Sequence, residues 1–81
     1  MDKQKLISLD TAARYMGVLN TAVRAWAHHG QLESWKQIDG SSLTSQGACD
    51  VFREKFEGAM ALERKRYVRA VAHFAQGRLD L

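Results

Sequence analysis

The sequence predicts a single, mainly α-helical domain with a small β-hairpin, and three observations lead to that fold class. The chain has 81 residues, which is enough for one domain at most. Apolar residues recur at intervals of three or four over residues 8–30 and again after residue 45, as they do along one face of a helix. Between them, residues 33–44 alternate around an Asp-Gly pair, which is typical of two strands joined by a tight turn. We therefore expect three to four helices and one hairpin.

The composition is that of an ordinary globular chain. Hydrophobic residues make up 46% and charged residues 26% of the sequence, and there is no proline. The single cysteine, Cys49, cannot form an internal disulfide and fits a reducing cytoplasm. No apolar run reaches the ~20 residues that a membrane span needs, and the N-terminus leads into no signal-peptide core. We expect a cytoplasmic protein with no membrane partner.

Residues 8–30 are predicted to form two short helices around a tight turn. Their helically spaced apolar positions are Leu9, Ala12, Ala13 and Met16, followed by Val23, Trp26 and Ala27. Ser8 is expected to cap the first helix and Asn20 the second, because each side-chain oxygen can accept from backbone amides at a helix start. Gly17 and Gly30 can adopt the positive φ that ends a helix sharply.

Residues 33–44 are predicted to form a hairpin with a two-residue type I′ turn at Asp39-Gly40, since both central positions of that turn need positive φ. Two roles are open for it. It can cover the core with its apolar residues, which are Trp35, Ile38 and Leu43. It can instead present polar groups to a partner, and these are Lys36 with the hydroxyls of Ser41, Ser42 and Thr44.

A third helix is expected over residues 45–57. Ser45 stands where a capping side chain is needed. The inward face is predicted to be Val51, Phe52 and Phe56, with the two aromatic residues one turn apart. These side chains should close the core.

An amphipathic basic helix is expected within residues 58–81, with Gly58 as an interruption and candidate hinge before it and Gly77 as its cap. One face, on which residues keep a spacing of three or four, is Met60, Glu63, Tyr67, Ala70, Val71 and Phe74, whereas the other face carries Arg64, Lys65, Arg66 and Arg69. Such a helix can cover the domain, pair with a second copy or contact nucleic acid. The pattern leaves these three roles open.

The order of these motifs resembles that of excisionase and mercury-resistance-regulator (MerR-like) winged helix-turn-helix domains. The residues that carry the resemblance are Ser8, Ala12-Ala13, Gly17-Val18, Val23-Arg24, Trp26 and Gly30-Gln31-Leu32. It covers residues 6–56 and implies a domain that binds double-stranded DNA, with its second helix in the major groove and the hairpin as a wing. In the resembling domains the wing usually brings arginine or lysine to the DNA backbone, whereas this hairpin offers only Lys36.

The resemblance places the candidate DNA-binding residues on the side of the second helix that points away from Val23 and Trp26, which should pack inward against Ala13. Arg24 is the strongest candidate, since a guanidinium can fork onto guanine O6 and N7 or clamp a phosphate. The alternative is an ordinary solvated arginine. Asn20, at the helix start, suits a phosphate or an adenine edge, or serves only as a cap.

Five further residues complete the candidate set. Thr21 shares the helix start, and Ala25 stands where many relatives have a second arginine, so that a thymine methyl is the contact expected there. His28 can meet a phosphate when protonated, although near neutral pH it is mostly uncharged. The hairpin adds Lys36 and Ser41.

Catalysis, metal binding and a cofactor are not expected. His28 and His29 are adjacent and therefore point roughly 100° apart on a helix, which is poor geometry for one ion. Cys49 and His73 lack a ligand-like spacing to them. The sequence has no glycine-rich phosphate loop and no local pairing of a nucleophile with a base.

These patterns predict sequence-preferring binding to double-stranded DNA in the nucleoid. The protein would act as a small transcription regulator, a recombination accessory factor or the DNA-binding domain of a larger protein. A net charge of +3 weakly favours polyanions. Pairing with a second copy or a larger protein partner is expected, because half-site recognition usually needs it. The alternative is a protein-interaction module in a nucleoprotein assembly, which the weakly basic hairpin and Ala25 favour.

Overall fold

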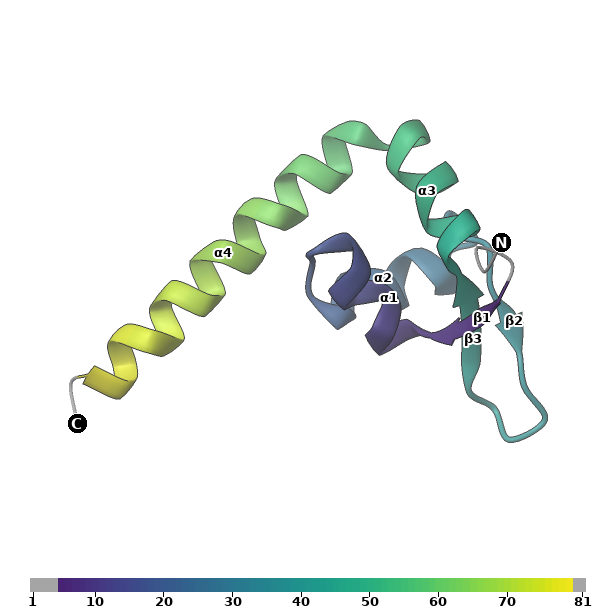
Figure 1. The fold of residues 1–81 in the computed structure, drawn as a ribbon, viewed down its shortest axis with the longest axis horizontal. Helices are drawn as coiled ribbons and strands as arrows, with labels where there is room; N and C mark the ends of the chain where they lie inside the picture. The colour runs from purple at the N-terminus through teal and green to yellow at the C-terminus, as the bar shows by residue number, and fades with distance from the viewer. Residues whose placement is uncertain (1–4, 80–81) are drawn as a thin grey trace.

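The computed structural model describes residues 5–79, and over that range the chain forms four helices and three short strands (Figure 1). Their order is β1 (Leu6–Ser8), α1 (Leu9–Met16), α2 (Asn20–His28), β2 (Trp35–Lys36), β3 (Ser42–Ser45), α3 (Gln46–Lys55) and α4 (Glu57–Leu79). The mainly helical fold class with a small β element is therefore confirmed.

The tight turn between α1 and α2 forms as the sequence predicts. The Ser8 hydroxyl caps α1 by accepting from the Thr11 amide at 3.0 Å. Gly17 ends the helix with a φ of +74°, and its amide donates to the Ala13 carbonyl at 2.8 Å. This left-handed residue reverses the chain within a few positions, so that α2 packs directly on α1.

The prediction that Asn20 caps α2 is wrong. Leu19, whose side chain cannot accept a hydrogen bond, occupies the capping position, and Asn20 is the first helical residue. The Asn20 amide instead donates to the Asp10 Oδ1 atom at 3.1 Å. Asn20 was expected to accept a hydrogen bond from a backbone amide of α2, but its side chain is instead bound to the Asp10 carboxylate on α1. At the other end of α2, Gly30 has the positive φ that was predicted, +76°.

The core lies where α1, α2 and α3 meet, and its buried residues are Ala12, Ala13, Met16, Val18, Val23, Trp26, Leu32, Ala48, Cys49, Phe52 and Met60. Val23 and Trp26 turn inward, as predicted. The Trp26 ring lies on the Phe52 ring with a centroid distance of 4.3 Å, and Phe52 lies on Phe56 at 4.8 Å. This aromatic row fixes α2 against α3.

The sheet has three antiparallel strands in the order β1-β3-β2, so the hairpin is joined by a strand that the sequence did not reveal. Strand β1 pairs with β3 in the register Leu6↔Ser45 and Ser8↔Leu43. Thr44 lies at the centre of β3 with no exposed surface, and its hydroxyl donates to the Glu33 carbonyl at 2.7 Å. That bond anchors β3 to the segment that follows α2.

The hairpin turn is not the predicted type I′ turn at Asp39-Gly40. Gly40 has a φ of +93°, but Asp39 does not have a positive φ. The Gly40 amide donates to the Gln37 carbonyl and the Gln37 amide to the Ser41 carbonyl, which makes a three-residue loop. The Asp39 carboxylate accepts from both the amide and the hydroxyl of Ser41, and this local ring favours the longer loop.

The hairpin does not cover the core with the three predicted residues. Ile38, at the tip of the loop, is fully exposed, and Trp35 is 41% exposed, whereas Leu43 is half-buried. Because the loop extends beyond the body, the residue at its tip has no neighbouring element to pack on (Figure 1).

Helix α3 has the predicted cap but a different inward face. The Ser45 hydroxyl accepts from the Ala48 amide at 3.0 Å. Val51 is 58% exposed, and the buried position is instead Cys49, which has no exposed surface. Cys49 lies three residues before Phe52 and therefore shares its helix face. Val51 is the residue directly before Phe52 and is rotated from it by roughly 100° about the helix axis.

The break between the last two helices falls at Phe56, not at Gly58. Phe56 leaves the helical conformation with φ −123° and ψ 53°, and Gly58 lies in the first turn of α4. The rings of Phe52 and Phe56 lie one turn apart, and the Phe56 amide completes the last turn of α3 by donating to the Phe52 carbonyl at 2.8 Å. Gly77 does not cap α4, which continues to Leu79.

Helix α4 leaves the body after its second turn (Figure 1). Met60 is buried, and Arg64, predicted on the outer basic face, turns inward so that its Nε donates to the Met16 carbonyl at 3.3 Å. Beyond it, Tyr67 and Val71 are 39% and 51% exposed. The radius of gyration is 14.0 Å, whereas a compact chain of this length has about 12 Å. No helix in the described part of the chain is long and apolar enough to cross a membrane.

Candidate functional site

The outer face of α2 carries the side chains that the sequence placed there. Thr21, Arg24, Ala25 and His28 follow one another at spacings of three, one and three residues, and all four are exposed. Because residues with these spacings share one side of a helix, they form a continuous strip opposite the buried Val23. We call these four residues the α2 outer strip.

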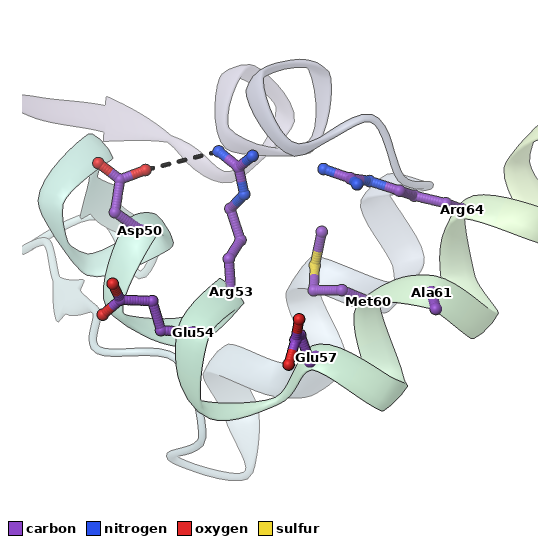
Figure 2. Close-up of a pocket in the computed structure, with 7 residues that line it drawn as sticks. All are labelled: Asp50, Arg53, Glu54, Glu57, Met60, Ala61 and Arg64. Carbon is purple, nitrogen blue, oxygen red and sulfur yellow. Dashed lines mark ion pairs between the residues drawn. The ribbon is translucent and has the colours of Figure 1, made fainter.

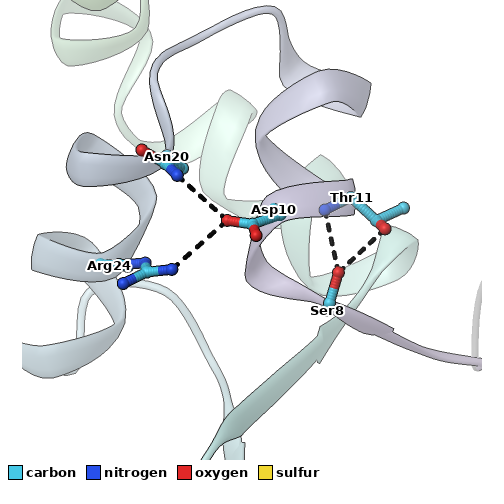
Figure 3. A network of polar contacts seen from close by, with 5 residues as sticks. All are labelled: Ser8, Asp10, Thr11, Asn20 and Arg24. Atoms are coloured by element: carbon cyan, nitrogen blue, oxygen red, sulfur yellow. Dashed lines mark hydrogen bonds and ion pairs between the residues drawn. The ribbon is translucent and has the colours of Figure 1, made fainter.

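Arg24 and Asn20 both contact Asp10, which the sequence reasoning missed (Figure 3). The Asp10 Oδ1 atom accepts from Asn20 Nδ2 at 3.1 Å and lies 3.5 Å from Arg24 Nη2. Asn20 and Arg24 are one helical turn apart, so a single oxygen on α1 can serve both. The side chain of Arg24 remains 62% exposed and that of Asp10 57%. The pair is therefore open to solvent and to a partner.

A hollow of about 380 Å³ joins this group to the hairpin, and its lining is Ser8, Leu9, Asp10, Arg24, Gly40, Ser41 and Ser42. Arg24 and Ser41 thus line one surface although they are 17 positions apart in the sequence. Lys36 pairs with Ser42 across the ladder, and side chains of such pairs point to the same face of a sheet. Ser41 therefore lines the hollow beside Arg24, whereas Lys36 lies next to a lining residue, Ser42, and is not itself part of the lining.

The hairpin loop also carries a negative charge. Hydrogen bonds from the hydroxyl and the amide of Ser41 lower the pKa of the Asp39 carboxyl, which stays ionised at neutral pH. The Ser41 hydroxyl donates to Asp39 at 2.7 Å. Ser41 is therefore engaged within the loop, and the loop tip is less attractive to an anion than its two serines suggest.

A second, larger hollow of about 950 Å³ lies between α3 and α4, and its lining is Asp50, Arg53, Glu54, Glu57, Met60, Ala61 and Arg64 (Figure 2). Arg53 pairs with Asp50 at 3.5 Å, and the Tyr15 hydroxyl donates to the same carboxylate at 2.9 Å. Three acidic side chains accompany two arginines, so this hollow has no strong preference for one sign of charge.

The histidines and the cysteine remain apart. The rings of His28 and His29 meet edge to face at 5.3 Å on the surface, whereas Cys49 is buried between the helices. Over residues 5–79, no three side chains of His, Cys, Asp or Glu come close enough together to hold a metal ion.

Comparison with known proteins gives no relative for this chain. No protein-family model matches it, and neither a curated protein nor a solved structure does.

Proposed function

We propose that this domain binds double-stranded DNA with a sequence preference, placing α2 in the major groove in the manner of the winged helix-turn-helix domains that its sequence resembles. The observation that carries the proposal is the exposure of the α2 outer strip, with Arg24 at its centre, beside a hairpin that lines the same hollow. Two short helices at a tight turn present such a strip to a groove. The protein would serve as a transcription regulator, a recombination accessory factor or a module of a larger protein.

Each residue of the proposed interface has a separate task. Arg24 supplies the forked donors that read guanine or hold a phosphate. Thr21 and Asn20 lie at the start of α2, where exposed backbone amides suit a phosphate. Ala25 would meet a thymine methyl, and His28 a phosphate when protonated. From the hairpin, Lys36 would contact the DNA backbone, and Ser41 would do so by exchanging its hydroxyl hydrogen bond to Asp39 for one to a phosphate.

A salt series on duplex binding tests this proposal, with Arg24→Ala compared with Arg66→Ala. The two arginine side chains are matched, since they are 62% and 61% exposed and each pairs with a carboxylate on its own domain. We expect the affinity of the wild type to fall steeply with salt. Arg24→Ala should lose about fivefold to 150-fold in affinity, which corresponds to the 1–3 kcal/mol of a forked base contact, while Arg66→Ala loses little.

Two outcomes would contradict the proposal. Absence of duplex binding by a folded wild type would favour the protein-interaction module as the function. An equal loss in both variants would mean that α4 contributes as much to DNA binding as α2, with no special role for Arg24.

For α4 we propose a second copy of the chain as the partner. Tyr67 and Val71 lie on the side that Met60 and Arg64 share, and the Arg64 side chain is turned to the Met16 carbonyl. Lys65 and Arg69 lie on the opposite side, so two such helices can meet without bringing like charges together. In such a dimer each copy would bind one half-site of the DNA, so that two half-sites are recognised together.

Sedimentation equilibrium tests this pairing with Val71→Glu and Leu62→Glu. The two positions are 51% and 50% exposed, and a spacing of nine residues puts them on opposite sides of the helix. We expect Val71→Glu to shift the protein to monomer and Leu62→Glu to leave it paired. A wild type that stays monomeric at high concentration would refute the pairing.

A further inference from the structure

Asp10 shares one carboxylate oxygen between two of the proposed DNA-contacting side chains. Its Oδ1 accepts from Asn20 Nδ2 and lies 3.5 Å from Arg24 Nη2 (Figure 3). A carboxylate at the centre of a surface meant for a polyanion calls for a physical explanation. In the first turn of α1 it favours that helix through the helix dipole, although the Ser8 hydroxyl already caps the helix.

Resting on the proposed DNA-binding function, we infer that Asp10 is a positioning residue that directs Arg24 and Asn20 toward base edges and away from phosphates. An arginine side chain has five N–H donors in a rigid planar fork. Asp10 lies beside the Nη2 group and so favours one rotation of the fork, while the second N–H of Nη2 stays available to form a forked pair with a neighbouring nitrogen. An oriented fork is what a guanine edge requires, since it presents two acceptors at fixed separation.

The charge of Asp10 discriminates between the two kinds of acceptor. A phosphate seated on Arg24 brings a second negative charge close to the Asp10 carboxylate, and the two repel. Guanine O6 and N7 are neutral acceptors and meet much less repulsion. Binding to the DNA backbone, which every sequence offers, is therefore weakened more than binding to the preferred base.

Asn20 is oriented by the same contact. Its Nδ2 donates to Asp10, which leaves the second N–H of the amide and its Oδ1 atom for a partner. An adenine edge needs one donor and one acceptor from such an amide. The contact with Asp10 thus leaves Asn20 able to read adenine.

The test compares Asp10→Asn with Glu54→Gln, which removes the same charge from α3 at the other hollow. A preferred duplex is first selected with the wild type from a random-sequence library. Affinities for that duplex and for a mixed-sequence duplex of equal length are then measured across a salt series. Both variants should fold, because the Asp10–Arg24 pair is exposed and such pairs contribute little to stability; circular dichroism checks this.

For Asp10→Asn we expect binding to the mixed-sequence duplex to rise about threefold to tenfold. Its salt slope should steepen by about 0.9, the value for one added phosphate contact. The preference for the selected duplex should fall by a similar factor, whereas Glu54→Gln should leave that preference unchanged. If both variants keep the wild-type preference and slope, Asp10 has no positioning role although the DNA-binding function stands. If the wild type binds no duplex, the proposed function and this inference both fail.

Discussion

Replacing Phe52 by alanine should remove a large part of the stability of this domain. Phe52 is 2% exposed and lies between the rings of Trp26 and Phe56, at 4.3 and 4.8 Å. Truncating such a buried ring costs about 3–5 kcal/mol. The free energy of unfolding of a domain of this length is about 4–12 kcal/mol, at about 0.05–0.15 kcal/mol per residue. The variant should therefore be marginally folded or unfolded at room temperature.

The matched control is Val51→Ala, at the adjacent position of α3. Val51 is 58% exposed, and alanine is the better helix former, so the free energy of unfolding should change by less than about 0.5 kcal/mol. Urea denaturation followed by tryptophan fluorescence measures both variants. If Val51→Ala costs as much as Phe52→Ala, then α3 buries a different face and the aromatic row does not fix α2.

Three further predictions concern the frame of the site. Thr44→Val should cost about 1–3 kcal/mol, because the Glu33 carbonyl loses its donor; denaturant midpoints measure this, and Thr44→Ser should retain more stability. Gly17→Ala should cost about 1–2 kcal/mol through its φ of +74°, seen as a lower melting temperature without a change of fold. Burial raises the pKa of the Cys49 thiol to about 11 from its ordinary value of 9.0. Because the unfolded thiol ionises first, the contribution of Cys49 to stability should be constant below pH 9 and fall as the pH rises toward 11; thermal melts of the wild type and Cys49→Ala at several pH values would show the same fall in both if the thiol were accessible.

Much of the fold follows from local rules in the sequence. Ser8 and Ser45 cap helices, and Gly17 closes the turn, because each acts within three or four residues of itself. The helical spacing of Val23 and Trp26 also predicted the buried face of α2. The α2 outer strip is the opposite face of the same helix. Local rules failed where a distant group competes, as at Asn20, whose amide Asp10 engages.

Other features depend on tertiary packing that a one-dimensional pattern does not contain. Strand β1 has only three residues and forms because β3 offers it an edge. The contact of Asp10 with Arg24 requires α1 and α2 to cross at one angle, so no spacing in the sequence reveals it.

The most direct test of the account is a titration of ¹⁵N-labelled protein with a mixed-sequence duplex at low salt, followed by amide chemical shifts. The account predicts that the largest shifts occur at Thr21, Arg24 and His28 on α2, with smaller ones around Ser41 in the hairpin loop. Shifts concentrated around Arg69 on α4, or no shifts at all in a folded protein, would contradict it.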